Sequence, residues 1–160
     1  KKNGYQFLWK EAMARVRDTT ISFTFLNKHT YYTISSLMED TAELFFTGTG
    51  ANDPHFNLRH EPAFIIRKKG KDQQFINVTE IHGNFDPIAE FSTNANPSVK
   101  SIKMPVNNDQ YTIAEIDVTG KTLTVAVCNG DADKTKKHTV NGITWTGPFA
   151  VIYDGKDLTN

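Results

Sequence analysis

Short runs of alternating apolar and polar residues make up most of this chain. Ile21, Phe23 and Phe25 alternate with threonine and serine, which is the pattern of a half-buried strand. A polar turn at residues 27–30 leads into a second alternating run at residues 31–37. The two runs together predict a β-hairpin.

Runs of the same kind recur to the end of the sequence. Residues 63–69 and 75–82 flank a turn at residues 70–72, and they predict a second hairpin. Further strands are expected at residues 44–47, 99–104, 111–119, 122–128 and 149–153. Short strands separated by turns at such spacing are typical of an antiparallel sandwich.

A tight turn is predicted near the C-terminal end of the chain. Asn141 and Gly142 stand between Val140 and Ile143, and a type I′ turn favours Asn-Gly because both central residues need positive φ. The length of 160 residues is enough for one core of ordinary size. The sequence therefore predicts a single all-β domain over residues 1–160, folded as an antiparallel β-sandwich.

The first segment of the chain fits two different periods. Its apolar residues fall at helical spacing and would form one stripe on a helix: Tyr5, Leu8, Trp9, Ala12, Met13 and Val16. Tyr5, Phe7 and Trp9 also stand at every second position, which a strand tolerates. Period alone does not separate the two in a short run. We favour a short N-terminal helix packed on a sheet, with a strand as the alternative.

The charge composition bears on whether the chain binds nucleic acid, an acidic polysaccharide or a membrane. Eighteen basic residues balance eighteen acidic ones, so the formal net charge is zero. The densest basic group, Arg67-Lys68-Lys69 with Lys71, is too small for a general nucleic-acid binder, and no nucleic-acid partner is expected. A local basic groove for an acidic polysaccharide stays open. No apolar run approaches the roughly 20 residues of a membrane span, so none is expected.

Specific chemical motifs are scarce. The sequence has neither a Gly-x-Ser-x-Gly elbow nor a phosphate-binding loop, and no cofactor is expected. The one cysteine, Cys128, ends an apolar strand and is interpreted as a buried, inert thiol. His55 and His60, with Asp53 and Glu61 nearby, match no common zinc spacing, so no metal site is predicted.

Two carboxylates could belong to a glycosidase site. Glu115 and Asp117 share one strand face because they are two residues apart. A glycosidase needs two carboxyl groups facing each other across a sugar, whereas a solvated strand face needs nothing more, and we favour that interpretation. Aromatic side chains that could stack on sugar rings, if exposed, are Trp9, Trp145, Tyr31, Tyr32 and Tyr111.

Four segments carry a resemblance to a known family. They are residues 4–12 (GYQFLWKEA), residues 50–59 (GANDPHFNLR) continuing into 61–67 (EPAFIIR), residues 75–83, and residues 137–139 followed by 144–147 (TWTG). In this order they resemble the C-terminal β domain of heparinase II/III-like polysaccharide lyases, closest to the oligoalginate lyase branch. The chain departs from its relatives at Ile81, where they often have a proline.

The resemblance implies a longer, secreted or periplasmic parent in which an α/α toroid precedes β-sandwich domains. Such lyases cleave uronic-acid polysaccharides, either alginate or glycosaminoglycans, by β-elimination. A Tyr or His base removes the C5 proton while Asn, His or Arg neutralises the uronate carboxylate, which stabilises the developing enolate. No position of this chain matches those residues, so no catalytic residue is assigned to it.

We therefore predict an accessory C-terminal domain whose partner is the catalytic toroid of the same parent chain. An autonomous carbohydrate-binding module is the alternative, and an independent glycosidase using Glu115 and Asp117 is a third. Two long polar stretches, residues 48–59 and 83–98, are expected to be ordered loops, where binding residues commonly lie. The predicted residues for carbohydrate or interdomain contact are Asn52, Asp53, His55, Asn57, Arg59, His60 and Arg67. Asn52 and Asp53 could instead only fix the loop by bonding its backbone.

Overall fold

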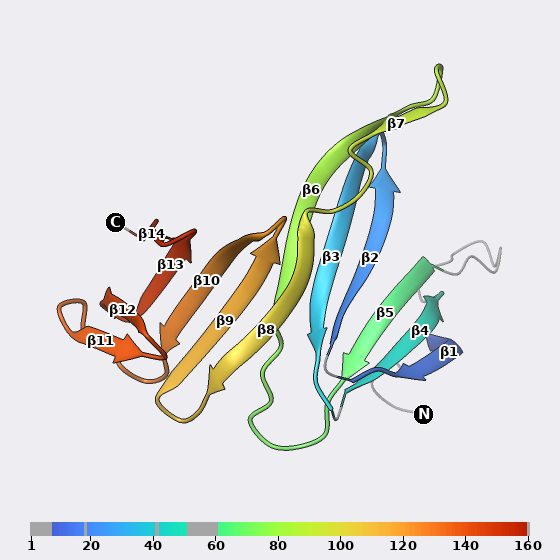
Figure 1. The fold of residues 1–160 in the computed structure, drawn as a ribbon. Helices are drawn as coiled ribbons and strands as arrows, with labels where there is room; N and C mark the ends of the chain where they lie inside the picture. Colours follow the sequence, from blue (N-terminus) through green and yellow to red (C-terminus); the bar gives the residue numbers. More distant parts are fainter. Residues whose placement is uncertain (1–7, 18, 41, 51–60, 160) are drawn as a thin grey trace. The chain divides into compact units, whose positions relative to one another are not determined.

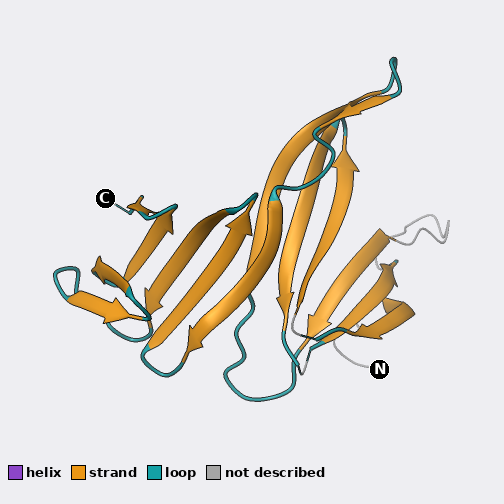
Figure 2. Cartoon of the chain, in the orientation of Figure 1, coloured by secondary structure: helices purple, strands orange, loops and turns teal. Residues whose placement is uncertain are grey.

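The computed structural model describes residues 8–17, 19–40, 42–50 and 61–159. These residues form β-strands and turns and contain no helix (Figure 2). The chain divides into two compact units: Lys1–Thr19 with Met38–Gln74 makes unit 1, and Thr20–Leu37 with Phe75–Asn160 makes unit 2. Each unit is built from antiparallel strands.

Unit 1 contains a three-stranded sheet with the strand order β1-β4-β5 (Figure 1). Its strands are β1 (Leu8–Arg15), β4 (Glu43–Thr49) and β5 (Glu61–Arg67). The preferred prediction of an N-terminal helix is wrong over the described residues, because β1 pairs with β4 along its length. A bulge between Lys10 and Ala12 shifts the register, so Trp9 and Ala12 project from the same face although they are three residues apart. That spacing imitates the period of a helix.

Unit 2 contains two sheets and a hairpin. The four-stranded sheet has the order β2-β3-β6-β7, from β2 (Thr19–Asn27), β3 (Thr30–Met38), β6 (Asn77–Asp86) and β7 (Phe91–Thr93). The five-stranded sheet has the order β14-β13-β10-β9-β8, from β8 (Val99–Asn107), β9 (Tyr111–Val118), β10 (Lys121–Cys128), β13 (Phe149–Tyr153) and β14 (Lys156–Asp157). The hairpin joins β11 (Lys137–Val140) to β12 (Ile143–Thr146).

The predicted strands are found, but the hairpin predicted between residues 63–69 and 75–82 is wrong. β5 pairs with β4, whereas β6 pairs with β3 and β7. The segment between β5 and β6 leads from unit 1 into unit 2 instead of closing a hairpin. The expected loop at residues 83–98 is also partly wrong, because the ends of β6 and β7 pair there around a turn.

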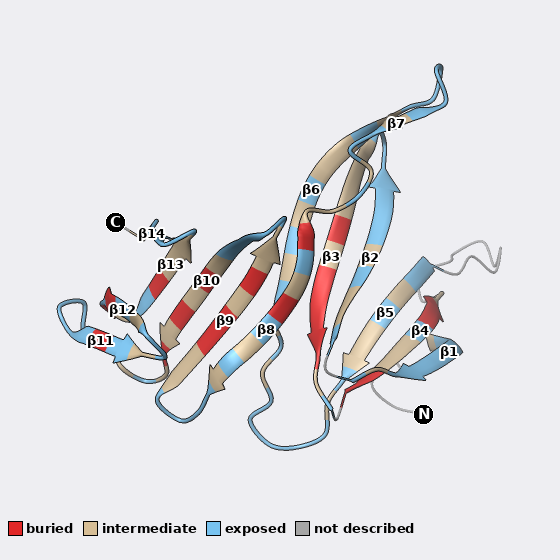
Figure 3. Ribbon diagram, in the orientation of Figure 1, coloured by how far each residue is buried: buried red, intermediate tan, exposed pale blue. Residues whose placement is uncertain are grey.

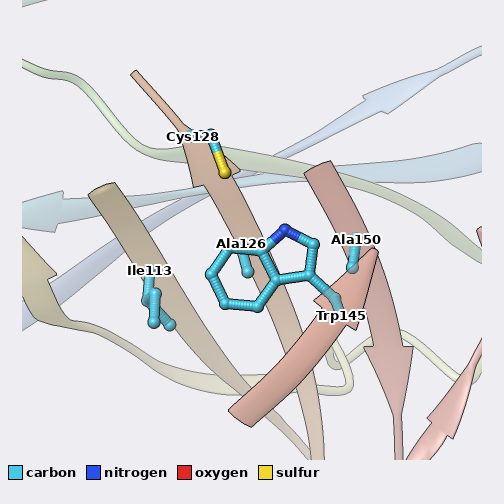
Figure 4. Close-up of a cluster of buried hydrophobic side chains, with 5 residues drawn as sticks. All are labelled: Ile113, Ala126, Cys128, Trp145 and Ala150. Atoms are coloured by element: carbon cyan, nitrogen blue, oxygen red, sulfur yellow. The ribbon is translucent and has the colours of Figure 1, made fainter. Parts of the chain in front are cut away.

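The central strands β9 and β10 are buried on both faces, since alternate residues enter two different hydrophobic clusters (Figure 3). On one face Ile113 and Ala126 pack with Trp145 of β12, as Figure 4 shows. On the other face Ile116 packs with Leu37 of β3. Because the second cluster joins the two sheets of unit 2, the predicted antiparallel β-sandwich is confirmed.

The short β11–β12 hairpin covers the first of these clusters. Val140 pairs with Ile143, and the two residues between them have the positive φ values of a type I′ turn, 52° at Asn141 and 77° at Gly142. This confirms the turn predicted from Asn-Gly. Trp145, which is 3% exposed, lies against the two fully buried alanines Ala126 and Ala150.

Hydrogen bonds between side chains fix the four-stranded sheet. Thr24 Oγ1 lies 2.8 Å from Thr33 Oγ1, which lies 2.8 Å from His82 Nε2. His82 Nδ1 lies 2.9 Å from the Asn94 carbonyl oxygen, which can only accept, so Nδ1 donates this bond; in the neutral imidazole Nε2 then accepts from Thr33. The bond to Asn94 holds the chain after β7 against β6.

Gly83 makes the closest approach between these two segments. Its φ is +58°, and a Cβ atom there would lie 2.2 Å from the Asn94 carbonyl oxygen and 2.5 Å from that of Thr93. We expect Gly83→Ala to lower the free energy of unfolding by about 3 kcal/mol or more, from backbone strain and steric overlap together. Denaturant unfolding measures this. Gly120→Ala is the control, since its φ is +83° but nothing lies within 4 Å, and it should cost only about 1–2 kcal/mol. Equal losses in the two variants would contradict this account.

Candidate functional site

Only one of the predicted contact residues lies in the described part of the chain. Arg67 ends β5 in unit 1. The other six, Asn52, Asp53, His55, Asn57, Arg59 and His60, lie outside the described residues, and their role stays a prediction. Arg67 and the side chains around it form the candidate site in the described part of the chain.

Arg67 is held by a carboxylate on the neighbouring strand. Glu43 begins β4 and pairs directly with Arg67 in the sheet, and its side chain is 9% exposed. Arg67 Nε and Nη2 donate to Glu43 Oε2 at 3.0 and 2.6 Å. The guanidinium also lies 4.9 Å from the centroid of the Phe45 ring. These contacts fix one edge of a guanidinium whose side chain stays 58% exposed.

A second arginine approaches the same carboxylate from the other side. Arg15 of β1 pairs with Glu43, and its Nε lies 3.5 Å from Glu43 Oε1. Residues directly opposite one another in a sheet project from the same face. Glu43 therefore stands on the central strand between two exposed arginines, one from each outer strand.

Further cations continue this arrangement beyond the strand ends. A hollow of about 230 Å³ is lined by Arg15, Arg17, Asp40, Ala42, Glu43 and Lys69. Arg17 lies 4.0 Å from Asp40, and both are about 70% exposed, so the pair adds little stability. Among the described residues, three cations and two carboxylates line the hollow and Arg67 adds a fourth cation beside it, so their summed charge is positive.

The cations act on the charge state of Glu43. The hydrogen bonds from Arg67 lower the pKa of this carboxyl most; burial opposes them, and the charges of Arg67, Lys69 and Arg15 lower the pKa further. Glu43 is therefore ionised at neutral pH. Its chemical role is to orient the arginines, while the exposed edges of those groups remain suited to an anion such as a sugar carboxylate.

Lys68 does not belong to this cationic group. Its side chain is 1% exposed, and its ammonium donates to the Glu39 carboxylate and the Gln74 carbonyl. Of the basic run at residues 67–69, the third side chain lines the hollow, the first lies beside it against Glu43, and the second is buried. This is the alternation of a strand end.

The other face of the same sheet is apolar. Three cross-strand rows form it: Trp9, Gly48 and Pro62; Ala12, Phe46 and Phe64; and Ala14, Leu44 and Ile66. The large aromatic side chains are well exposed, Trp9 at 42%, Phe46 at 36% and Phe64 at 47%. The rings of Phe46 and Phe64 lie 5.1 Å apart. Among the aromatic residues considered from the sequence, Trp9 is thus on a surface of the kind that stacks on sugars.

The remaining aromatic candidates lie in unit 2 and are engaged there. Trp145 is buried, and Tyr111 packs edge-on against it at 5.9 Å. Tyr31 Oη is 2.6 Å from Ser92 Oγ, and Tyr32 stacks on Phe25. These contacts assign the four side chains to the packing of unit 2.

Glu115 and Asp117 share one face of β9, as predicted. They line a hollow of about 210 Å³ with Ser101, Lys103, Gly120 and Thr122. Asp117 accepts a hydrogen bond from the Gly120 amide at 2.8 Å, and Glu115 stands beside Lys103 in the sheet. The two carboxylates stand side by side on a strand and do not face each other across a cleft, which argues against the glycosidase hypothesis.

The described residues include Cys128 and some of the side chains that could bind a metal. Cys128 is buried, and burial raises the pKa of its thiol, which keeps it protonated and unreactive. Within the described ranges, no three His, Cys, Asp or Glu side chains gather as metal ligands. His55, His60 and Asp53 lie outside these ranges.

Sequence reasoning missed Arg15, Arg17, Glu43 and Lys69 as members of one site. They come from segments far apart in the chain, and only the pairing of β1, β4 and β5 brings them together. One signal was present in the sequence. Glu43 stands directly before the apolar run Leu44-Phe45-Phe46, where a carboxylate without a cation nearby would be costly.

Two curated proteins are similar to this chain over almost its whole length. An exo-oligoalginate lyase of Saccharophagus degradans is 30% identical over 160 residues, which is 95% of this chain and 22% of that protein. An alginate lyase of Stenotrophomonas maltophilia is 33% identical over 155 residues, which is 94% of this chain and 21% of that protein. No protein-family model matches the chain.

These similarities confirm the resemblance to alginate lyases found in the sequence, closest to the oligoalginate lyase branch. The chain spans only about a fifth of the length of these relatives. The match is consistent with a C-terminal domain of a larger alginate lyase. In the described residues no helix is long and apolar enough to cross a membrane.

The lowered pKa of Glu43 predicts how pH acts on unit 1. Because the folded carboxyl titrates below the usual value of 4.5, its contribution to stability is complete above that pH and is lost as the pH falls through the folded pKa. We expect Glu43→Gln to destabilise the protein at neutral pH, and the difference from wild type to shrink below pH 4.5. Unfolding curves across pH measure this, with Glu11→Gln on β1 as the control. A difference that does not change with pH would contradict the role given to Glu43.

Proposed function

We propose that this chain is a non-catalytic β domain of a polysaccharide lyase that cleaves uronic-acid polysaccharides by β-elimination. Its partner in the same parent chain is a catalytic α/α toroid of the heparinase II/III-like kind, and the parent is periplasmic or secreted. The observation that carries the proposal is the match to two alginate lyases over 95% and 94% of this chain but only 22% and 21% of theirs.

The chemistry of the described residues supports an accessory role. β-Elimination requires a base and a group that neutralises the uronate carboxylate, both beside the same sugar. The hollow beside Glu43 supplies cations, and among the described residues no tyrosine or histidine lines it. Tyr31 and His82 do lie together in unit 2, but the ring nitrogens of His82 are bonded to Thr33 and Asn94. The described side chains of this protein therefore favour binding of an acidic polysaccharide over its cleavage.

The test compares this chain with its full-length parent on alginate, heparan sulfate and chondroitin sulfate. The unsaturated uronate that β-elimination forms is followed by its ultraviolet absorbance. We expect the parent to be active on alginate and this chain to be inactive on all three. Activity in this chain alone would overturn the accessory role, and a parent inactive on every uronic-acid polymer would overturn the proposed lyase.

An autonomous carbohydrate-binding module is the second candidate, and the exposed aromatic face of unit 1 favours it. Trp9, Phe46 and Phe64 give this face a set of rings that could stack on sugars. We expect Trp9→Ala combined with Phe64→Ala to abolish binding of alginate oligomers by this chain if the module hypothesis holds. Titration calorimetry measures it. Phe91→Ala, which removes a 64% exposed ring from unit 2, is the control, and unchanged binding in the double variant would reject the aromatic platform.

A further inference from the structure

One face of the unit 1 sheet carries an organised group of cations. Arg15 and Arg67 flank Glu43 on the two outer strands, and strands in a sheet are about 4.8 Å apart, so their backbones are about 10 Å apart. Arg17 lies two residues after Arg15, and Lys69 lies two residues after Arg67. Both side chains line the hollow. The face thus presents two pairs of cations with a groove of carboxylates between them.

The carboxylates in this groove do not cancel the cations. Glu43 is 9% exposed and uses both its oxygens on Arg15 and Arg67, so it is hidden beneath them. The arginine side chains above it are 67% and 58% exposed. A ligand that approaches from solvent therefore meets guanidinium groups before it meets Glu43. Among the described residues that line the hollow, Asp40 is the exposed carboxylate that would repel it.

The geometry favours an anion with planar, two-oxygen groups. Arg67 already forms two hydrogen bonds to a single carboxylate oxygen, which shows how its fork is oriented and leaves other donors for a second acceptor. Several cations arranged along two strand ends suit a chain of repeated charges better than a single small ion. Because Glu43 and Phe45 hold the Arg67 guanidinium, and Glu43 also pairs with Arg15, less entropy is lost when these two arginines bind a ligand.

We propose that this basic hollow, lined by Arg15, Arg17 and Lys69 with Arg67 beside it, binds the carboxylates of an acidic polysaccharide. The choice of ligand rests on the proposed function, since a lyase for uronic-acid polymers meets a sugar carboxylate at every residue of its substrate. The site would hold the polymer through its carboxylates.

The experiment measures binding of a defined mannuronate oligomer to the full 160-residue chain by titration calorimetry at low salt. Arg17→Gln with Lys69→Gln should weaken binding at least about tenfold, because two exposed charge-assisted contacts are lost. Asp40→Asn should strengthen binding, because it removes a competing negative charge. Damage to the fold would weaken binding in both variants, so the opposite signs separate the site from a loss of structure.

Two matched controls complete the design. Lys134→Gln with Lys156→Gln removes the same charge from exposed positions of unit 2 and should leave affinity within about twofold of wild type. A neutral mannose oligomer of the same length should bind far more weakly than the mannuronate oligomer. Equal binding of the two oligomers, or equal losses in the two double variants, would overturn the proposed site.

The outcome is distinguishable from a failure of the proposed function. If the parent cleaves alginate but this chain does not bind the oligomer, the hollow is rejected while the lyase assignment stands. If the chain binds the oligomer through the hollow but the parent cleaves no uronic-acid polymer, the lyase assignment fails and a carboxylate-binding site remains.

Discussion

The two-sided burial of β9 and β10 determines how the rest of unit 2 is arranged. Alternate residues of these strands enter different clusters, with Ile113 and Ala126 on one face and Ile116 and Leu123 on the other. A strand covered on both faces needs two covering layers, and here they are the four-stranded sheet and the β11–β12 hairpin. Close packing then limits side-chain size. The face that receives the Trp145 indole has the fully buried alanines Ala126 and Ala150 beneath it (Figure 4).

The limited length of the β11–β12 hairpin also explains why the same face of β9 becomes polar at one end. Ile113, Glu115 and Asp117 lie on one side of β9, but only Ile113 enters the cluster around Trp145. Beyond the hairpin the face becomes polar, with Lys103 and Thr122 beside the carboxylates. The change from apolar to charged residues along β9 thus lies where the β11–β12 hairpin stops covering it. Glu115 and Asp117 therefore need no catalytic explanation.

Hydrophobic period predicted the existence of strands well and their partners poorly. Strands β8, β9, β10 and β13 lie where alternation placed them, and Asn141-Gly142 predicted its own turn from local chemistry. Pairing between distant strands leaves no local signal. The chain passes between the two units three times, so β5 and β6, which are neighbours in sequence, belong to different sheets. The bulge in β1 also caused the wrong prediction of a helix, because it gives two residues on one strand face the spacing of a helix.

The same limit applies to the candidate site. Arg67 was named from the resemblance of its segment to lyases, whereas Arg15 and Glu43 become its neighbours only through sheet pairing. A charged residue at the end of a strand is usually solvated, so sequence alone gives no reason to group residues from three such ends. The structure supplies the reason, because one nearly buried carboxylate stands between them.

Glu43 is not the residue that stability alone would favour at this position. Its neighbours on β4 are Leu44 and Phe45, and a buried carboxylate must recover its desolvation cost from the cations around it, which often does no more than break even. What the carboxylate adds is orientation, since Arg67 and Arg15 are directed by it while their side chains stay largely exposed. An apolar residue at position 43 would avoid this desolvation cost but would leave both guanidinium groups without their carboxylate partner. A carboxylate at this position therefore gives the face cations of fixed direction, and such order lowers the entropy that is lost when an anionic group binds.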